Sequence, residues 1–249
     1  MTLLFLLSAI AFFSHAKDAE PHFSPKESGC LIYKDLSDPK QIKTFGHNCK
    51  LQTPPCSTFK ITLAELGFKN EKLEPKGEIF KWDGKIRNRE SLNKDQDLSS
   101  WMKDSAVWVS SIVVNRLGQE KIRSELKDLS YGNASIGPDE FWIKGPLSLS
   151  VEEQISYLSR TNSKHLERSI QLLPEEKVGA LSVKGKTGSC YIGDPQKRQQ
   201  IGWYIGRVKS ADREYAFALR FINEKNSKTD GPAGFRAKEL FLKWLPRSN

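Results

Sequence analysis

A serine hydroxyl and a lysine amine stand three residues apart in the sequence STFK, residues 57–60. Prolines before this segment and apolar residues after it predict that it opens a helix, so Ser57 and Lys60 lie on one face. A serine hydroxyl attacks a carbonyl group only when a base removes its proton, and a lysine with a lowered pKa is such a base. The pair predicts acyl transfer through a serine nucleophile.

Ser-x-x-Lys by itself is a weak signal, because it also begins at Ser14, Ser37, Ser91, Ser100 and Ser124. What distinguishes Ser57 is a set of later motifs in a fixed order. A cation and a hydroxyl beside a glycine, as in the last of these motifs, are suited to holding a carboxylate. The motifs are Ser105-Ala106-Val107, Tyr131-Gly132-Asn133, Phe141-Trp142-Ile143-Lys144-Gly145 and Lys186-Thr187-Gly188.

These motifs, together with Gly234-Phe235-Arg236, resemble those of the penicillin-recognising serine hydrolases and, within them, the class D (oxacillinase-type) β-lactamases. The resemblance covers nearly the whole chain after residue 16, and the Ser-Asp-Asn motif expected of class A relatives is missing. It implies an enzyme that hydrolyses β-lactam antibiotics, oxacillin-type penicillins included, by acylation and deacylation of Ser57. A small-molecule β-lactam is therefore the expected partner.

The resemblance also implies a base of an unusual kind. Lys60 is expected to react with carbon dioxide, supplied as bicarbonate, to give a carbamate, and no other cofactor is expected. Burial lowers the pKa of a lysine and supplies the neutral amine that this reaction needs. Val107 and Ile143 are expected to form the apolar wall around the carbamate, and the Trp142 indole N–H to donate to it.

Other roles follow from the same resemblance. Ser105 is expected to relay a proton to the leaving nitrogen with the help of Lys186, and the backbone N–H groups of Ser57 and Ser189 to form the oxyanion hole. The remaining residues are expected to hold the substrate carboxylate or to shape the site. Those that bind substrate are Thr187, Gly188 and Arg236, together with Val107 and Ser189, and those that shape the site are Tyr131, Gly132 and Asn133.

Two rivals within serine acyl transfer remain, a D-alanyl-D-alanine peptidase and a penicillin-binding sensor domain, both of which acylate but turn over slowly. The apolar residues expected around Lys60 favour turnover. A rival from another class is an exported binding protein without activity. A labelled penicillin distinguishes it, because such a protein is not acylated at Ser57.

The four cysteines, Cys30, Cys49, Cys56 and Cys190, include no C-x-x-C pair, and no metal site is expected. Four cysteines allow three pairings, which the sequence does not rank. Cys56 precedes the predicted nucleophile and Cys190 follows Gly188, so the sulfur atoms are close if the two motifs face each other, and some class A relatives bridge similar positions. We expect Cys56–Cys190 and Cys30–Cys49 disulfides, with free thiols as the alternative.

The N-terminus predicts export. Residues 3–13 are apolar but too few to span a bilayer, and Ser14-His15-Ala16 offers small residues for a signal peptidase. Residues 1–16 are therefore expected to be removed as a signal peptide, which places the mature chain in the periplasm or outside the cell. No later segment is apolar enough to predict a membrane span in the mature chain.

Apolar spacing predicts an α/β (α+β) fold in a single catalytic unit. The pattern predicts a hairpin at residues 29–33 and 41–45, followed by a mostly helical region at residues 57–173. Three strands are then expected at residues 179–188, 201–208 and 214–222, and a final amphipathic helix at residues 237–244. This order predicts an antiparallel sheet flanked by helices. A discontinuous subdomain, about 17–65 and 174–249, then carries an all-helical insertion, about 66–173.

The net charge of +9, from 39 Lys and Arg against 30 Asp and Glu, attracts anions of any kind. The tryptophans are scattered and no nucleic-acid motif is present, so no nucleic-acid partner is expected. Lys85, Arg87 and Arg89 are interpreted as a solvated face. The sequence makes no prediction of the oligomeric state.

Overall fold

The computed structural model describes residues 21–23, 27–193, 198–223 and 231–245. The predicted signal peptide, residues 1–16, lies outside these residues. In the described part of the chain, no helix combines the length and apolar character needed to cross a membrane.

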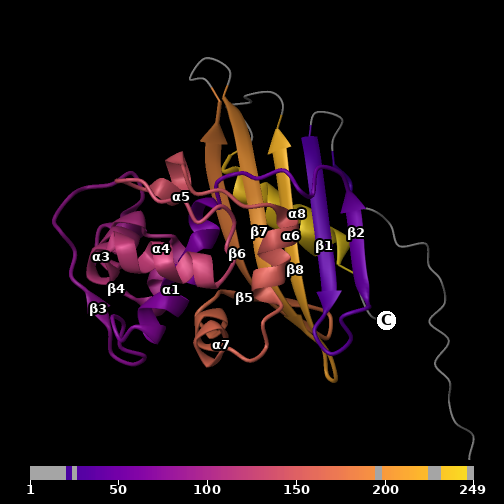
Figure 1. Ribbon diagram of the computed structural model, residues 1–249, viewed down its shortest axis with the longest axis horizontal. Helices are drawn as coiled ribbons and strands as arrows, with labels where there is room; N and C mark the ends of the chain where they lie inside the picture. The colour runs from indigo at the N-terminus through magenta and orange to yellow at the C-terminus, as the bar shows by residue number, and fades with distance from the viewer. Residues whose placement is uncertain (1–20, 24–26, 194–197, 224–230, 246–249) are drawn as a thin grey trace, which may run out of the picture.

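A six-stranded antiparallel sheet forms the centre of the molecule, with strand order β2-β1-β8-β7-β6-β5 (Figure 1). The strands are β1 (Glu27–Asp35), β2 (Ile42–Gly46), β5 (Glu175–Val178), β6 (Leu181–Ile192), β7 (Gln199–Lys209) and β8 (Glu214–Asn223). The predicted hairpin and the three predicted C-terminal strands are therefore confirmed. Chain segments from both ends of the sequence meet where β1 pairs with β8.

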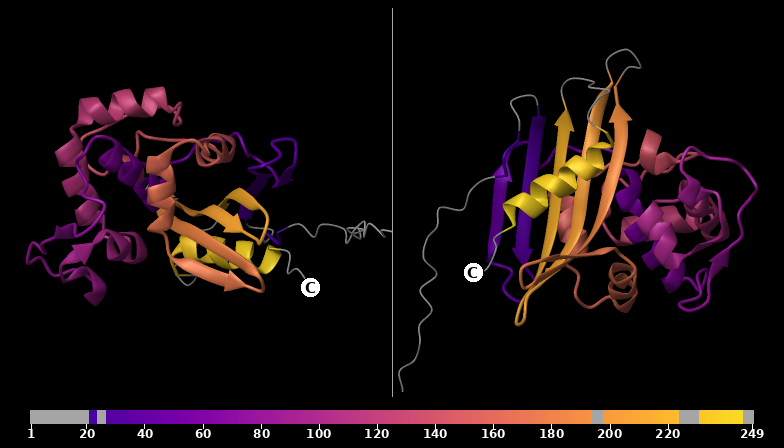
Figure 2. Two further views of the ribbon diagram at one scale, coloured as in Figure 1. Left: turned by 90° about the horizontal axis from the view of Figure 1, so that it is seen from below. Right: turned by 180° about the vertical axis from the view of Figure 1, so that it is seen from behind.

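One face of the sheet is covered by α8 (Ala233–Trp244), which crosses the strands as the view from behind in Figure 2 shows. Side chains alternate along a strand, so Leu31 and Phe217 point to this helix, while neighbouring Ile32 and Ala218 point to the other face. The helix starts four residues before the predicted 237–244, because its first turn lacks a regular apolar pattern from which its start could be read.

The opposite face and the β6 side of the sheet carry the other helices: α1 (Phe59–Lys69), α2 (Leu98–Asp104), α3 (Val107–Leu117), α4 (Gln119–Asp128), α5 (Phe141–Lys144), α6 (Val151–Leu158) and α7 (Lys164–Gln171). Residues 59–68, nearly all of α1, are buried, so α1 is the central helix of this layer.

Two details differ from the sequence-based picture. The predicted helical insertion includes α6, but α6 packs against β1 and β8 in the sheet, because it buries an apolar face there. A small second sheet, β3 (Ile79–Phe80) with β4 (Gln96–Asp97), was not predicted, since strands of two residues leave no alternating pattern.

Both predicted disulfides are present. Cys30 bonds to Cys49, and Cys56 bonds to Cys190 across 134 residues of sequence. The described residues contain no cluster of three or more side chains suited to a metal ion.

We expect Phe241→Ala to lower the free energy of unfolding by about 3–5 kcal/mol. Phe241 is fully buried under the sheet and stacks on Phe217 with ring centroids 3.8 Å apart. Phe235, on the same helix, is 59% exposed, so Phe235→Ala is the matched control and should change stability by less than about 1 kcal/mol. Urea unfolding measures both, and equal losses would contradict the packing described here.

Candidate active site

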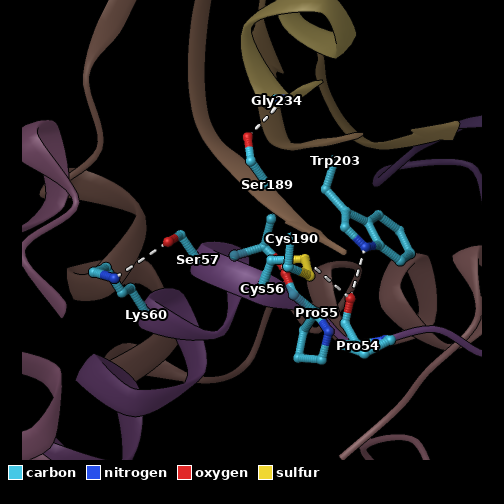
Figure 3. Close-up of a disulfide and its surroundings, with 10 residues drawn as sticks. Pro54, Pro55, Cys56, Ser57, Lys60, Ser189, Cys190, Trp203 and Gly234 are labelled. Carbon is cyan, nitrogen blue, oxygen red and sulfur yellow. Dashed lines mark hydrogen bonds between the residues drawn. A yellow bond between two sulfur atoms is a disulfide. The ribbon is translucent and has the colours of Figure 1, made fainter. Parts of the chain in front are cut away.

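The predicted serine and lysine lie together at the start of the central helix. Ser57 belongs to the 3₁₀ turn η1 (Cys56–Thr58), and Lys60 lies in the first turn of α1. Lys60 Nζ is 3.4 Å from Ser57 Oγ, as the dashed line in Figure 3 marks. The structure therefore brings the expected nucleophile and base within hydrogen-bond reach.

Lys60 is 1% exposed, and no ion pair to it is found among the described residues. Burial lowers the pKa of its amine well below the ordinary value, because charge is costly away from water. The cations of Lys186 and Arg89 lower this pKa further, while Glu140 opposes them. The result is an amine that is neutral far more readily than a solvated lysine.

The residues expected to surround Lys60 lie in α3 and α5. Val107 and Ile143, half-buried, pack against the main apolar core. Trp142 is 1% exposed and stacks on Phe59, the neighbour of Lys60, with centroids 5.9 Å apart. The indole N–H of Trp142 is buried and has no hydrogen-bond partner in the described chain. A buried donor without an acceptor costs free energy unless a further group accepts its hydrogen bond.

Lys186 is the second buried lysine of the site. It is 2% exposed, and its Nζ donates to the Thr187 carbonyl oxygen at 3.1 Å. Burial, together with the charge of Arg89, lowers the pKa of Lys186 to about 7. This lysine is therefore poised to gain or lose a proton near neutral pH.

The strand that carries Lys186 has an open edge at the site. β5 pairs with β6 only as far as Lys184, and the Gly185 N–H donates to the Pro174 carbonyl oxygen on the β5 side. Backbone groups two residues apart on a strand point to the same edge, so those of Thr187 and Ser189 also point away from β7. The Ser189 N–H thus faces the edge that a substrate would approach.

The segment before Ser57 packs tightly against this strand. A Cβ on Gly188 would lie 2.9 Å from Thr58 Cγ2 and 3.0 Å from the Pro55 carbonyl oxygen. Only glycine fits such an approach without a shift of its neighbours. Gly188 therefore acts by letting β6 come close to η1, beside the Cys56–Cys190 bond seen in Figure 3.

Ser105 links α2 to α3 in a left-handed conformation with φ of 58°. Cys56 and Glu140, which adjoin the site from two other elements, also have positive φ, of 53° and 44°. Residues other than glycine rarely adopt this region, and such conformations cluster at functional sites. Three of the segments that surround Ser57 therefore carry backbone held in an uncommon shape.

Tyr131, Gly132 and Asn133 lie behind the site. The Tyr131 ring is fully buried, and its hydroxyl donates to Gln154 Oε1 at 3.3 Å. Asn133 Nδ2 donates to the Pro146 carbonyl oxygen at 2.8 Å, which ties the segment after α5 in place. These contacts are those of residues that shape and hold the site.

Arg236 is expected to bind the substrate carboxylate, but its side chain already pairs with a carboxylate of the protein. Its Nε donates to Glu27 Oε1 at 3.3 Å on the α8 face of the sheet. Binding of a substrate carboxylate by Arg236, which stays a prediction, requires it to exchange this partner. Thr187 is half-buried and Ser189 exposed, and the Ser189 hydroxyl accepts from the Gly234 N–H at 2.7 Å.

Arg89 is the residue that sequence reasoning missed. Arg89 is exposed, as the interpretation of a solvated face expects, and its Nη2 donates to the Asp104 carbonyl oxygen at 2.6 Å, directly before Ser105. Its charge acts on both Lys60 and Lys186. No carboxylate pairs with it among the described residues. No sequence signal marks it, because a loop and not a periodic element brings it to the site.

Comparison with known proteins agrees with this geometry. The model of the penicillin binding protein transpeptidase domain matches residues 24–170. The β-lactamase OXA-1 of Escherichia coli is 32% identical, over 80% of this chain and 77% of that protein. The chain belongs to the class D β-lactamases.

Solved structures place this class D β-lactamase in the same fold. FUS-1 (OXA-85), a class D β-lactamase from Fusobacterium nucleatum subsp. polymorphum, superimposes with a TM-score of 0.75 at 26% identity, covering 88% of this chain and 91% of that one. The C-terminal domain of the Bacillus licheniformis BlaR penicillin-receptor gives 0.78 at 27% identity, covering 88% and 89%. The chain is thus an enzyme that hydrolyses the β-lactam amide, in a fold shared with a receptor domain.

We expect Arg89→Gln to move the acidic limb of the pH–rate profile of β-lactam hydrolysis to higher pH. Removing this cation raises the pKa of Lys60, so a higher pH is needed to make the amine of this base neutral. The measurement is kcat/KM for benzylpenicillin from pH 5 to 9. Arg123→Gln, an exposed arginine on α4, removes the same charge and is the matched control. An unmoved limb in Arg89→Gln would show that its charge does not reach the lysines.

Proposed function

We propose that this β-lactamase opens the ring of penicillins, oxacillin-type ones included, by acylation of Ser57, and that it releases the product with an N-carboxylated Lys60 as base. The observation that carries the proposal is the buried Lys60 amine, 3.4 Å from Ser57 Oγ and without an ion-pair partner among the described residues. A lysine whose pKa is lowered in this way meets the requirement for carboxylation.

The residues around Lys60 fit a carbamate. Val107 and Ile143 offer apolar contacts, and the partnerless Trp142 N–H offers a donor for one carbamate oxygen. When present on Lys60, the carbamate supplies a carboxylate-like base for both half-reactions. These residues would hold it, keep water away from it and keep it next to Ser57.

The other groups of the site act on the substrate. The Ser57 hydroxyl attacks the β-lactam carbonyl carbon, and the N–H groups of Ser57 and Ser189 stabilise the negative charge on its oxygen. Lys186, with a pKa of about 7, can pass a proton through Ser105 to the leaving nitrogen. Thr187 and the cation of Lys186 would bind the substrate carboxylate.

Export stays part of the proposal. The two disulfides support an oxidising compartment, the periplasm or the exterior, because such bonds persist there and are rare in the cytosol. Removal of residues 1–16 as a signal peptide would bring the chain there. N-terminal sequencing of the exported protein tests this, and an intact N-terminus would contradict it.

We expect hydrolysis of benzylpenicillin and oxacillin to fall when bicarbonate is removed and to recover when it is added back. Lys60→Ala should lower kcat by about 10²–10⁴-fold, the usual contribution of a general base, while the protein still binds penicillin. Steady-state kinetics and intact-protein mass spectrometry measure both. A wild-type protein that forms a stable acyl-enzyme without turnover would instead support a sensor, the role named for the BlaR receptor domain, or a peptidase.

We expect Trp142→Phe to lower activity in a way that excess bicarbonate partly restores, because loss of the indole N–H weakens the carbamate without removing the lysine. Trp101→Phe is the matched control, since Trp101 is equally buried but its N–H already donates to Ser110 Oγ at 3.0 Å. Activity against bicarbonate concentration is measured for each variant. The same bicarbonate dependence in both variants would argue against a carbamate held by Trp142.

A further inference from the structure

We infer that the Cys56–Cys190 disulfide holds the two halves of the oxyanion hole at a fixed separation, which makes both cysteines positioning residues for acyl transfer. The inference rests on the acylation of Ser57 proposed above. It assigns to the bond a part in the rate of the reaction, in addition to its contribution to stability.

The bond lies beside both halves of the hole. Cys56 directly precedes Ser57 in η1, and Cys190 directly follows Ser189 in β6, with 5.7 Å between the cysteine Cα atoms. Figure 3 shows Ser57 to the left of the bond and Ser189 above it. A covalent link one residue from each N–H group restrains the distance between the two donors.

Each N–H group lies at a position where its own helix or strand supplies no acceptor. Ser57 lies in the first turn of the η1–α1 segment, where N–H groups have no acceptor within the helix. The Ser189 N–H points from the open edge of β6, as the direction of the Gly185 N–H establishes. An oxygen between the two elements can therefore accept from both.

Besides the disulfide, each half of the hole has a hydrogen-bond anchor of its own. Trp203 Nε1, on β7, donates to the Pro54 carbonyl oxygen at 3.0 Å, which anchors the segment before Ser57. The Gly234 N–H, at the start of α8, donates to Ser189 Oγ at 2.7 Å. In the described structure, the disulfide is the covalent bond that joins these two separately anchored segments.

Restraint is needed at this place for two reasons. Among the described residues, no strand pairs with the outer edge of β6 beyond Lys184, so that edge is paired with β7 alone. Cys56 has a φ of 53°, a left-handed conformation that is unfavourable for an L-residue. Without the bond, the backbone before Ser57 is free to relax, and displacements of about 1 Å can cost about 10²-fold in rate.

The second disulfide provides a matched control. Cys30 lies in β1, which β7 and β8 separate from β6, and bonds to Cys49 with a Cα–Cα distance of 5.3 Å. Cys30 and Cys56 are both 0% exposed. Loss of the Cys30–Cys49 bond removes a cross-link with a similar Cα–Cα distance without touching either N–H group.

The experiment compares Cys56→Ala/Cys190→Ala with Cys30→Ala/Cys49→Ala, each well below its Tm. Rapid-mixing kinetics with benzylpenicillin separate the acylation rate constant from the Kd of the initial complex. Phenylboronic acid, which forms a tetrahedral adduct with a serine hydroxyl, probes the oxyanion hole directly. In the first variant, we expect acylation and phenylboronic acid affinity to fall together by at least about tenfold, with the Kd of the initial complex changed by less than about twofold.

The control variant should keep acylation and phenylboronic acid affinity within about twofold of the wild type. If the first variant does not fold, the control protein, in which Cys56–Cys190 is the remaining bond, is measured before and after reduction, with thiol labelling to show that the bond is open. Wild-type rates in a folded protein without the bond would overturn the inference. Absence of Ser57 acylation in the wild type would overturn the proposed function instead.

Discussion

The site depends on keeping an amine out of water without giving it a counter-ion. Lys60 lies in a helix that is buried on nearly every side, and its amine donates to the Ser57 hydroxyl. Transfer of a charged ammonium into such surroundings costs several kcal/mol, so the neutral form is favoured. A second buried lysine, Lys186, adds repulsion to the desolvation. Burial of these amines lowers the stability of the fold, but it keeps the amines reactive at neutral pH.

The rest of the fold can be understood as support for that arrangement. The apolar layer between α1 and the sheet excludes water, and the aromatic contacts of Phe59 with Tyr131, Phe141 and Trp142 fix the helix that carries Lys60. β6 brings Lys186 to the same place from the other side, and its missing strand partner leaves backbone groups for a substrate. Rigid elements on both sides of the reacting atoms are what acyl transfer requires.

Much of the fold and of the site was predictable because local sequence patterns indicate it. The strands alternate with period two, the final helix repeats its apolar residues, and the Ser57–Lys60 spacing places both side chains on one face of a helix. The short strands β3 and β4, the packing of α6 on the sheet and the contact of Arg89 with the Asp104 carbonyl were not predictable. Each of these depends on contacts between segments distant in sequence, for which a local pattern carries no signal.

The sequence by itself determined the types and order of the reactive groups: the hydroxyl and amine on one helix, the lysine, threonine and glycine of a later strand, and four cysteines able to pair. The tertiary structure alone decided that the Lys60 amine is buried without an ion-pair partner among the described residues. It also decided that Arg236 pairs with Glu27, while Arg89 acts on both lysines. Finally, it placed the disulfide between the neighbours of Ser57 and Ser189. The reason is physical: residue type fixes what a group can do, whereas pKa, pairing and approach depend on the neighbours that folding supplies.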